Sequence, residues 1–289
     1  MQNTFLNLNS SEKKADFCFV GIGCCSAEYL SGVECAADNV RNLSQRYANA
    51  DGSQLPLKVY NAEQGFILNK VIAFDAGTVT ANLSEFEEKL SKLEFEDACV
   101  PIFVGGDHSV SYPIVKNILN SHDDIVVIQF DAHSDYIDEY YEYPHGSVMN
   151  EISKLDKVEK IIHFGLRGNL NSGPAIKQTV ADGNMVILYK DISSSLNYVL
   201  EQIKGKKVYI SFDMDFLNPA VAPATNCPEP GGPSYEETLE YLKNIISYAK
   251  EVVGMDIVEY NPLCEGATIT GLVVVNIIME CMHYIHSKK

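Results

Sequence analysis

Short hydrophobic runs rich in Val, Ile, Phe and Tyr alternate along the chain with segments of helical spacing. Eight such runs occur, at residues 17–22, 57–61, 100–104, 124–130, 160–165, 185–189, 207–213 and 252–258. Their hydrophobicity is nearly continuous, which is typical of strands that are buried on both faces. The pattern predicts a three-layer α/β/α fold around a mostly parallel sheet of about eight strands.

The segments between these runs predict the helices that cover the sheet. Helical spacing or composition marks residues 35–47, 83–93, 110–119, 174–180, 193–203 and 234–249. In the last segment Ser234 precedes Glu236 and Glu237, which places a capping hydroxyl and two acidic residues at the positive end of the helix dipole. We therefore expect strands and helices to alternate along the chain.

The length of 289 residues suits one large α/β domain, and no linker favours two. The clearest Pro/Gly-rich stretch, residues 223–233, directly follows a cluster of acidic residues. We interpret it as an active-site loop and not as a hinge. Residues 1–289 are therefore predicted to form a single domain, with the polar residues 1–14 as a poorly ordered N-terminal extension.

The chain is strongly acidic, with 39 Asp and Glu against 22 Lys and Arg and a net charge of −17. This charge argues against a nucleic acid or an anionic membrane as partner, and it permits a cationic small molecule. The alternative is that most of the charge only keeps the protein soluble.

The eight cysteines form no Cys-x-x-Cys pair, and several lie inside apolar runs. They resemble the reduced core cysteines of a cytosolic protein. Residues 1–14 lack the pattern of an export signal. The longest uncharged apolar stretch, residues 268–279, is shorter than the roughly 20 residues of a membrane helix. These features predict a cytoplasmic location.

Three clusters of aspartate and histidine stand where hydrophobic runs end. They are Gly105-Gly106-Asp107-His108-Ser109, Asp131-Ala132-His133-Ser134-Asp135 and Ser211-Phe212-Asp213-Met214-Asp215. Open α/β sheets bind ligands at the carboxyl ends of their strands. Alternate residues of an extended backbone point the same way, so the side chains within a cluster are expected to converge on one face.

Six side chains of these clusters are candidate metal ligands, namely His108, Asp131, His133, Asp135, Asp213 and Asp215. Four carboxylates and two imidazoles are enough for two divalent ions about 3.5–4 Å apart if some carboxylates bridge. The oxygen-rich set suits Mn²⁺ better than Zn²⁺. A single Asp-x-Asp is more often a solvated loop or a helix cap, but three clusters at strand ends favour a metallohydrolase.

The motifs Gly-Gly-Asp-His-Ser, Asp-Ala-His-Ser-Asp and Ser-Phe-Asp-Met-Asp-Phe-Leu-Asn-Pro-Ala-Val-Ala-Pro together resemble the ureohydrolase family of arginases and agmatinases. The resemblance runs from about Phe17 to the C-terminus and is most specific at residues 104–262. It implies an arginase-like fold and two Mn²⁺ ions per chain. It also implies a homo-oligomer, a trimer or a hexamer.

The resemblance gives each ligand a role, with His108 and Asp135 on one ion, His133 and Asp215 on the other, and Asp131 and Asp213 bridging the two. The ions would hold a hydroxide that attacks the carbon of a guanidino group and releases urea and an amine. Water needs such activation, because its pKa must fall towards about 7 before it attacks so poor an electrophile. Asp135 is expected to act in catalysis as well.

Three further residues match positions near the substrate in this family. His145, fourteen positions after Asp131, would relay a proton to the departing amine, unless it is a loop histidine without a role. Glu259 would accept two parallel hydrogen bonds from the guanidinium, unless it is a surface glutamate. Cys227 replaces a family threonine beside the guanidinium. His163 lies in an apolar run and is more simply a hydrogen-bonded core residue.

The predicted substrate follows from Ile137, which stands where arginases have an asparagine that binds the α-carboxylate of arginine. Its side chain donates no hydrogen bond. The same loop is acidic and aromatic, with residues Tyr136, Asp138, Glu139, Tyr140, Tyr141, Glu142 and Tyr143. Such a surface would repel a carboxylate and accept an ammonium group, unless the loop is merely solvated. Agmatine, hydrolysed to urea and putrescine, is therefore the expected substrate.

Other functions stay open, because the chain departs from the family pattern at Asn218, at Asn226-Cys227 and in residues 31–37. Guanidinobutyrate, arginine and formiminoglutamate are alternative substrates. A non-catalytic protein of the same fold that binds metal or polyamine is the alternative from another class.

Overall fold

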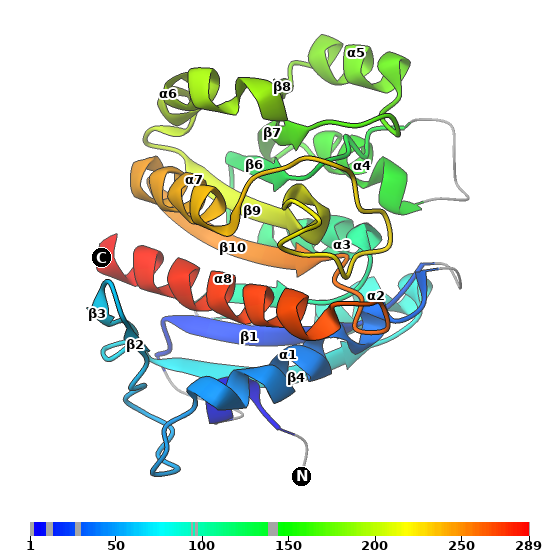
Figure 1. Ribbon diagram of the computed structural model, residues 1–289. Coiled ribbons are helices and arrows are strands. Elements are labelled where there is room, and N and C mark those ends of the chain that lie inside the picture. The colour runs from blue at the N-terminus through cyan, green and yellow to red at the C-terminus, as the bar shows by residue number, and fades with distance from the viewer. Residues whose placement is uncertain are drawn as a thin grey trace.

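The computed structural model describes residues 3–9, 14–26, 30–93, 95, 98–137 and 144–288. Its centre is one sheet of eight strands in the order β4-β1-β5-β10-β9-β6-β7-β8 (Figure 1). The strands are β1 (Phe17–Gly23), β4 (Ala73–Thr80), β5 (Val100–Val104), β6 (Ile125–Phe130), β7 (Val158–Leu166), β8 (Met185–Leu188), β9 (Lys207–Asp213) and β10 (Glu251–Val258). All neighbouring strands pair in parallel, as the sequence predicts.

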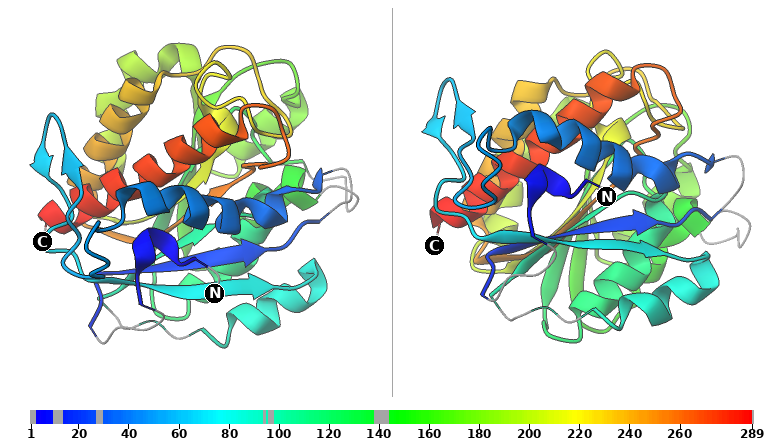
Figure 2. Two further views of the ribbon diagram at one scale, coloured as in Figure 1. Left: turned by 60° about the horizontal axis from the view of Figure 1, so that its bottom comes forward. Right: turned by 90° about the horizontal axis from the view of Figure 1, so that it is seen from below.

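Helices cover both faces of this sheet (Figure 2). The first face carries α1 (Ala36–Ser44), α6 (Ile192–Ile203), α7 (Tyr235–Tyr248) and α8 (Ala267–Lys288). The second face carries α2 (Leu83–Leu90), α3 (Ser111–Ile118), α4 (Val148–Ser153) and α5 (Gly173–Ala181). The prediction of a three-layer α/β/α fold is confirmed.

The central strands are hydrophobic throughout because each contributes side chains to two cores. In β6, Val126, Ile128 and Phe130 belong to the core that also contains residues of α6, α7 and α8, whereas Ile125 and Val127 belong to the core that contains residues of α3 and α4. Successive side chains of a strand point to opposite faces, so a strand covered on both sides needs apolar residues at nearly every position.

One predicted strand is wrong. The run 57–61 contributes only Tyr60 and Asn61 to a small hairpin, in which β2 (Tyr60–Asn61) pairs with β3 (Gly65–Phe66) outside the main sheet. The eighth strand of the sheet is instead β4, at the edge. The second half of β4, residues 77–80, is largely exposed. The strand therefore lacks the continuous hydrophobicity by which the other strands were predicted.

Helix α8 was not predicted, because its apolar residues surround it and give no amphipathic period. It is the one helix in the described residues that is long and apolar enough to span a membrane, yet 67% of its most apolar window is buried. It packs between α1 and α7 in the first core (Figure 2). It therefore serves here as a core helix. The short helix α4 was also missed.

Residues 3–9 differ from the predicted poorly ordered extension, because they pack onto the core. The ring of Phe5 stacks on Phe19 with 4.7 Å between centroids. The backbone N–H of Phe5 donates to Asp75, 2.7 Å away. The guanidinium of Arg41 donates to both carboxylate oxygens of Asp75, each at 2.8 Å. Asp75 thus joins the N-terminal segment, β4 and α1.

The register of the sheet brings the metal-ligand candidates together. Val104 of β5 pairs with Ile257 of β10, Ile257 pairs with Phe212 of β9, and Phe212 pairs with Phe130 of β6. These four residues lie side by side, one on each of the four central strands of the sheet. The residues that follow them therefore leave the sheet side by side, at its carboxyl edge.

The buried ion pair of Arg41 and Asp75 generates a stability prediction. Asp75→Ala should lower the free energy of unfolding by about 3–5 kcal/mol, because it leaves the buried guanidinium of Arg41 with only the exposed Asp38 as an ion partner. Urea unfolding measures the loss. Glu88→Ala is the control, since its pair with Lys92 is exposed and its removal should leave the stability almost unchanged. Equal unfolding midpoints for the two variants would contradict this role of Asp75.

Candidate metal centre

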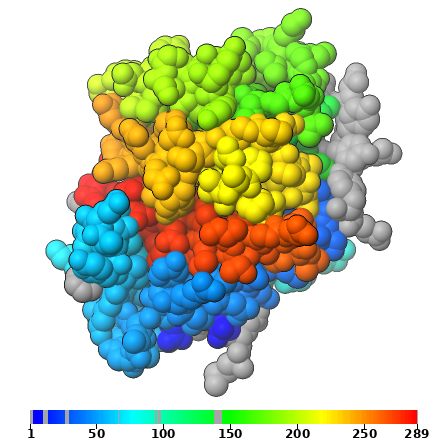
Figure 3. All heavy atoms as spheres, in the orientation of Figure 1, coloured from blue at the N-terminus to red at the C-terminus, as the bar shows by residue number. Residues whose placement is uncertain are grey.

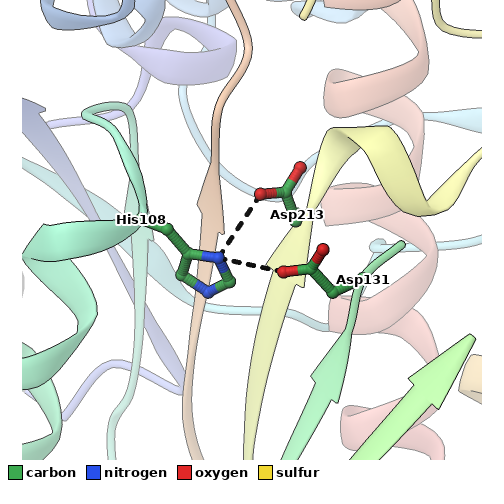
Figure 4. Close-up of side chains that lie close together, drawn as sticks. All are labelled: His108, Asp131 and Asp213. Atoms are coloured by element: carbon green, nitrogen blue, oxygen red, sulfur yellow. Dashed lines mark ion pairs between the residues drawn. The ribbon is translucent and has the colours of Figure 1, made fainter. Parts of the chain in front are cut away.

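The first group of candidate ligands surrounds Nδ1 of His108 (Figure 4). This nitrogen lies 2.8 Å from Asp135 Oδ2, 3.1 Å from Asp131 Oδ2 and 3.3 Å from Asp213 Oδ2. His108 follows β5, Asp131 and Asp135 follow β6, and Asp213 ends β9. The side chains that meet at Nδ1 of His108 thus come from the ends of three strands that are far apart in the sequence.

The second group adjoins the first and shares Asp131 with it. His133 Nδ1 lies 2.8 Å from Asp215 Oδ2 and 3.6 Å from Asp131 Oδ1. In each group, one potential ligand atom from each of three residues lies within 4.8 Å of the others. All six residues named from the sequence therefore lie around one place, with Asp131 between the two histidines. Asp213 belongs to the group of His108 in this arrangement.

The clusters converge through turns, and not through the extended backbone expected from the sequence. Asp131 accepts a hydrogen bond from the backbone N–H of His133 at 2.6 Å, and Asp213 accepts one from that of Asp215 at 2.8 Å. Asp135 has a φ of 46°, in the left-handed region. Each turn fixes one carboxylate oxygen on the backbone. The other oxygens of Asp131 and Asp213 face His108.

The carboxylates lie in a setting that disfavours their negative charge. Burial, followed by repulsion from Asp215 and Asp135, raises the pKa of Asp131 to about 7. Burial and repulsion from Asp215 and Asp131 raise the pKa of Asp213 well above its usual value. In the described part of the chain, His108 and His133 are the only side chains that form ion pairs with these groups.

The donor set fits divalent cations. Burial alone would lower the pKa of His108, but the surrounding carboxylates of Asp131, Asp135 and Asp213 raise it well above its usual value. The centre therefore favours positive charge at Nδ1 of His108. Carboxylate oxygens with a minor share of imidazole nitrogen are ligands that suit Mn²⁺ and similar ions.

A cavity of about 160 Å³ opens onto the two groups, and it also contains the three other predicted site residues. His145, Cys227 and Glu259 all line it, together with Asp135 and His133. A larger cavity of about 480 Å³ lies at the opposite edge of the sheet and includes a single carboxylate, that of Glu251. Only the smaller cavity unites the residues that suit hydrolytic chemistry.

Glu259 reaches the centre from β10, between the strands that supply the histidines and aspartates. Its φ of 62° is rare for a residue with a side chain, and its N–H donates to the carbonyl of Gly106 at 3.0 Å. Its Oε1 accepts the backbone N–H of His108 at 2.8 Å. Burial, followed by repulsion from Asp107, raises its pKa to about 8. Such backbone strain clusters at functional sites.

Cys227 and the loop around Ile137 complete the cavity. Cys227 is exposed at the surface, but partial desolvation of its thiol, followed by the charges of Glu259 and Asp213, raises its pKa to about 12. The thiol is therefore protonated at neutral pH and a poor nucleophile. Ile137 lines the cavity, as the substrate argument requires. Tyr136 does not belong to the predicted aromatic surface, because it is buried, and its hydroxyl donates to Asp182. Residues 138–143 lie outside the described residues.

A loop over residues 217–233 follows Asp215 and lies beside the start of α8 (Figure 3). The guanidinium of Arg167, which follows β7, donates to the backbone carbonyls of this region, among them those of Asp215, Phe216 and Glu229. Arg167 thus fixes the backbone that carries Asp215. Sequence reasoning missed this role, because hydrogen bonds to backbone carbonyls leave no motif.

Two polar residues inside apolar strands were also missed. Gln129 of β6 donates to Asp131 Oδ2 at 2.7 Å and contacts Nδ1 of His163 at 2.5 Å. His163 is thus the hydrogen-bonded core residue that its setting predicts, and burial lowers its pKa to about 3. Asp256 of β10 is fully buried behind His108. A polar residue within a continuous apolar run was the signal that could have identified Gln129 and Asp256.

The chain is similar in sequence to proteins of one known family. The model of the Arginase family matches residues 15–284. An agmatinase of Bacillus anthracis is 31% identical over 225 residues, which cover 74% of this chain and 76% of that protein. The mitochondrial guanidino acid hydrolase of Homo sapiens is 28% identical over 225 residues, covering 72% of this chain and 63% of that protein.

Solved structures share the fold. Formiminoglutamase of Trypanosoma cruzi, crystallised with Mn²⁺, superposes with a TM-score of 0.84 at 20% identity and full coverage of both chains. A putative agmatinase of Clostridium difficile superposes with a TM-score of 0.80 at 24% identity, covering 96% of this chain and 99% of that one. The family match over residues 15–284 and the agmatinase relative at 31% identity show that this chain belongs to the arginase family of metal-dependent amidinohydrolases.

Proposed function

We propose that this protein hydrolyses agmatine to urea and putrescine, with two manganese ions bound by its six aspartate and histidine ligands. The observation that carries the proposal is the pair of histidine–carboxylate groups joined through Asp131. Four of the six ligands line one cavity, namely His133, Asp135, Asp213 and Asp215. His108 and Asp135 would hold one ion, His133 and Asp215 the other, and Asp131 and Asp213 would lie between them. When bound, such ions lower the pKa of a coordinated water from 15.7 to about 7.

The residues of the cavity would orient the guanidino group and move its protons. Glu259 faces the same cavity as the ligands, and a carboxylate can pair with a planar guanidinium through parallel hydrogen bonds. Asp135 is 13% exposed, more than the other carboxylate ligands, and would accept a proton from the attacking water. His145 lines the cavity and would pass a proton to the departing amine.

The rest of the cavity favours a substrate without a carboxylate. Leu30, Ile137 and Leu170 line it, and its described lining contains no Lys or Arg. Asn171 also lines it, but its amide already donates to the carbonyls of Ala132 and Arg167. A carboxylate on the substrate would therefore lose water without gaining a charged partner, which is unfavourable. Agmatine carries an ammonium group at that end instead.

Guanidino acids are the second candidate class, since a guanidino acid hydrolase is among the relatives. A non-catalytic protein that binds metal or polyamine is the alternative from another class. The homo-oligomeric state and the cytoplasmic location stay predictions from the sequence.

Urea release from agmatine, guanidinobutyrate, arginine and formiminoglutamate, with and without added Mn²⁺, tests the proposal. Formiminoglutamate is scored by its own product, formamide. We expect Mn²⁺-dependent urea release, with the highest kcat/KM for agmatine, because the described lining of the cavity contains no Lys or Arg for a carboxylate. Preference for arginine would refute the substrate assignment. No product from any compound, by protein shown to contain two Mn²⁺, would favour the binding protein.

The ligand role of His133 predicts a separation of activity from stability. His133→Ala should abolish urea release and lower the free energy of unfolding of the metal-free protein by no more than about 2 kcal/mol. The reason is that His133 is partly exposed and contributes more to metal affinity than to packing. His283→Ala is the control and should keep full activity, because His283 is only half-buried on α8 and does not line the cavity. Full activity of His133→Ala would remove the assignment.

The apolar side chain of Ile137 predicts a change in specificity. Ile137→Asn supplies a hydrogen-bond donor, so kcat/KM for arginine relative to agmatine should rise by about 10-fold, the effect of one hydrogen bond of about 1–1.5 kcal/mol. Leu263→Asn is the matched control, because Leu263 is exposed and does not line the cavity. An unchanged ratio in Ile137→Asn would show that residue 137 does not select the substrate.

A further inference from the structure

A chain of buried hydrogen bonds runs from the far side of the His108 ring into the sheet. His108 Nε2 lies 2.9 Å from Ser211 Oγ. Ser211 Oγ donates to Asp256 Oδ1 at 2.8 Å, and the hydroxyl of Tyr209 donates to Asp256 Oδ2 at 2.7 Å. These four residues are almost completely buried. None of the last three lines the cavity among the described residues.

The sheet holds this chain in place. Ser211 of β9 and Asp256 of β10 are direct partners in the register, so their side chains lie side by side. His108 follows β5, the strand on the other side of β10. A carboxyl group in the interior of a sheet is costly, and a buried apolar residue of similar size would serve packing better. Packing therefore does not explain why an aspartate stands at position 256.

The direction of each hydrogen bond follows from what each group can donate. An ionised carboxylate only accepts, so the single hydrogen of Ser211 Oγ points to Asp256. Ser211 Oγ can then only accept from His108, which requires a hydrogen on Nε2. When a metal ion takes the place of the second ring proton, the imidazole is neutral and carries one hydrogen, so Nδ1 is left with a lone pair. Nδ1 is the atom that faces Asp131, Asp135 and Asp213.

We propose that Asp256, acting through Ser211, is a positioning residue that keeps the hydrogen of His108 on Nε2 and so presents Nδ1 to a metal ion. The proposal rests on the metal site of the proposed function. Imidazoles that bind metals usually donate their other N–H to a carboxylate, a carbonyl or water, and loss of that partner weakens metal binding 10- to 100-fold. Here Ser211 links the carboxylate of Asp256 to the Nε2 atom of His108.

Among the residues that the structure describes, no such chain reaches the other histidine. His133 Nε2 lies 3.9 Å from Glu229 Oε1, beyond hydrogen-bond distance. Only the ion beside His108 should therefore depend on Ser211 and Asp256. This asymmetry distinguishes a positioning role from a general loss of structure, which would affect both ions.

The test is Mn²⁺ binding to the purified protein, followed by the electron paramagnetic resonance of free Mn²⁺. The wild type should bind two ions per chain. In Ser211→Ala and Asp256→Asn the dissociation constant of one ion should rise about 10- to 100-fold, with a smaller change at the other. Asp256→Asn should have the larger effect, because its amide can donate to Ser211 Oγ and reverse the chain, which moves the hydrogen to Nδ1.

Tyr209→Phe is the matched control, since it removes a hydroxyl from Asp256 but leaves the chain to His108 intact. It should weaken binding less than Ser211→Ala does. Binding of two ions by both test variants as tightly as by the wild type would overturn the positioning role. A wild type that binds no Mn²⁺ would instead overturn the proposed function on which it rests.

If the variants do not fold, the wild-type protein is loaded with diamagnetic Cd²⁺. The ¹⁵N NMR spectrum of His108 then shows which ring nitrogen carries the hydrogen. A hydrogen on Nε2 supports the positioning role, and a hydrogen on Nδ1 overturns it.

Discussion

Repulsion among buried carboxylates is the constraint on which this structure depends. Asp131 and Asp213 leave the sheet side by side because the residues before them, Phe130 and Phe212, are partners in the register of β6 and β9. Two negative charges so close together in a buried setting are strongly unfavourable. The fold tolerates them because a core on both faces of the sheet fixes the strands, and because cations bound at the site would remove the repulsion.

The backbone near the site is held by its own hydrogen bonds. Turns at Asp131 and Asp213 occupy one oxygen of each carboxylate, Glu259 accepts the N–H of His108, and Arg167 fixes the loop after Asp215. The remaining oxygens and the Nδ1 atoms of both histidines are thereby directed to one region. A preorganised set of this kind binds a metal ion without further ordering of the side chains.

The sequence predicted the sheet wherever strands are buried on both faces, because continuous hydrophobicity marks such strands. It failed at the edge, where β4 is half exposed, and at residues 57–61, where Leu57 and Val59 are buried in the core but form no strand of the main sheet. The meeting of the ligands could be predicted from their places at strand ends. The pairing of Ser211 with Asp256 could not, because it depends on the register between β9 and β10.

The central claim is that two metal ions lie between His108 and His133 and share Asp131. Diffraction from crystals grown with Mn²⁺, recorded at the absorption edge of manganese, tests it most directly. The account predicts two anomalous peaks per chain, one beside Nδ1 of His108 and one beside Nδ1 of His133, about 3.5–4 Å apart. A single peak, or two peaks in separate cavities, would contradict it.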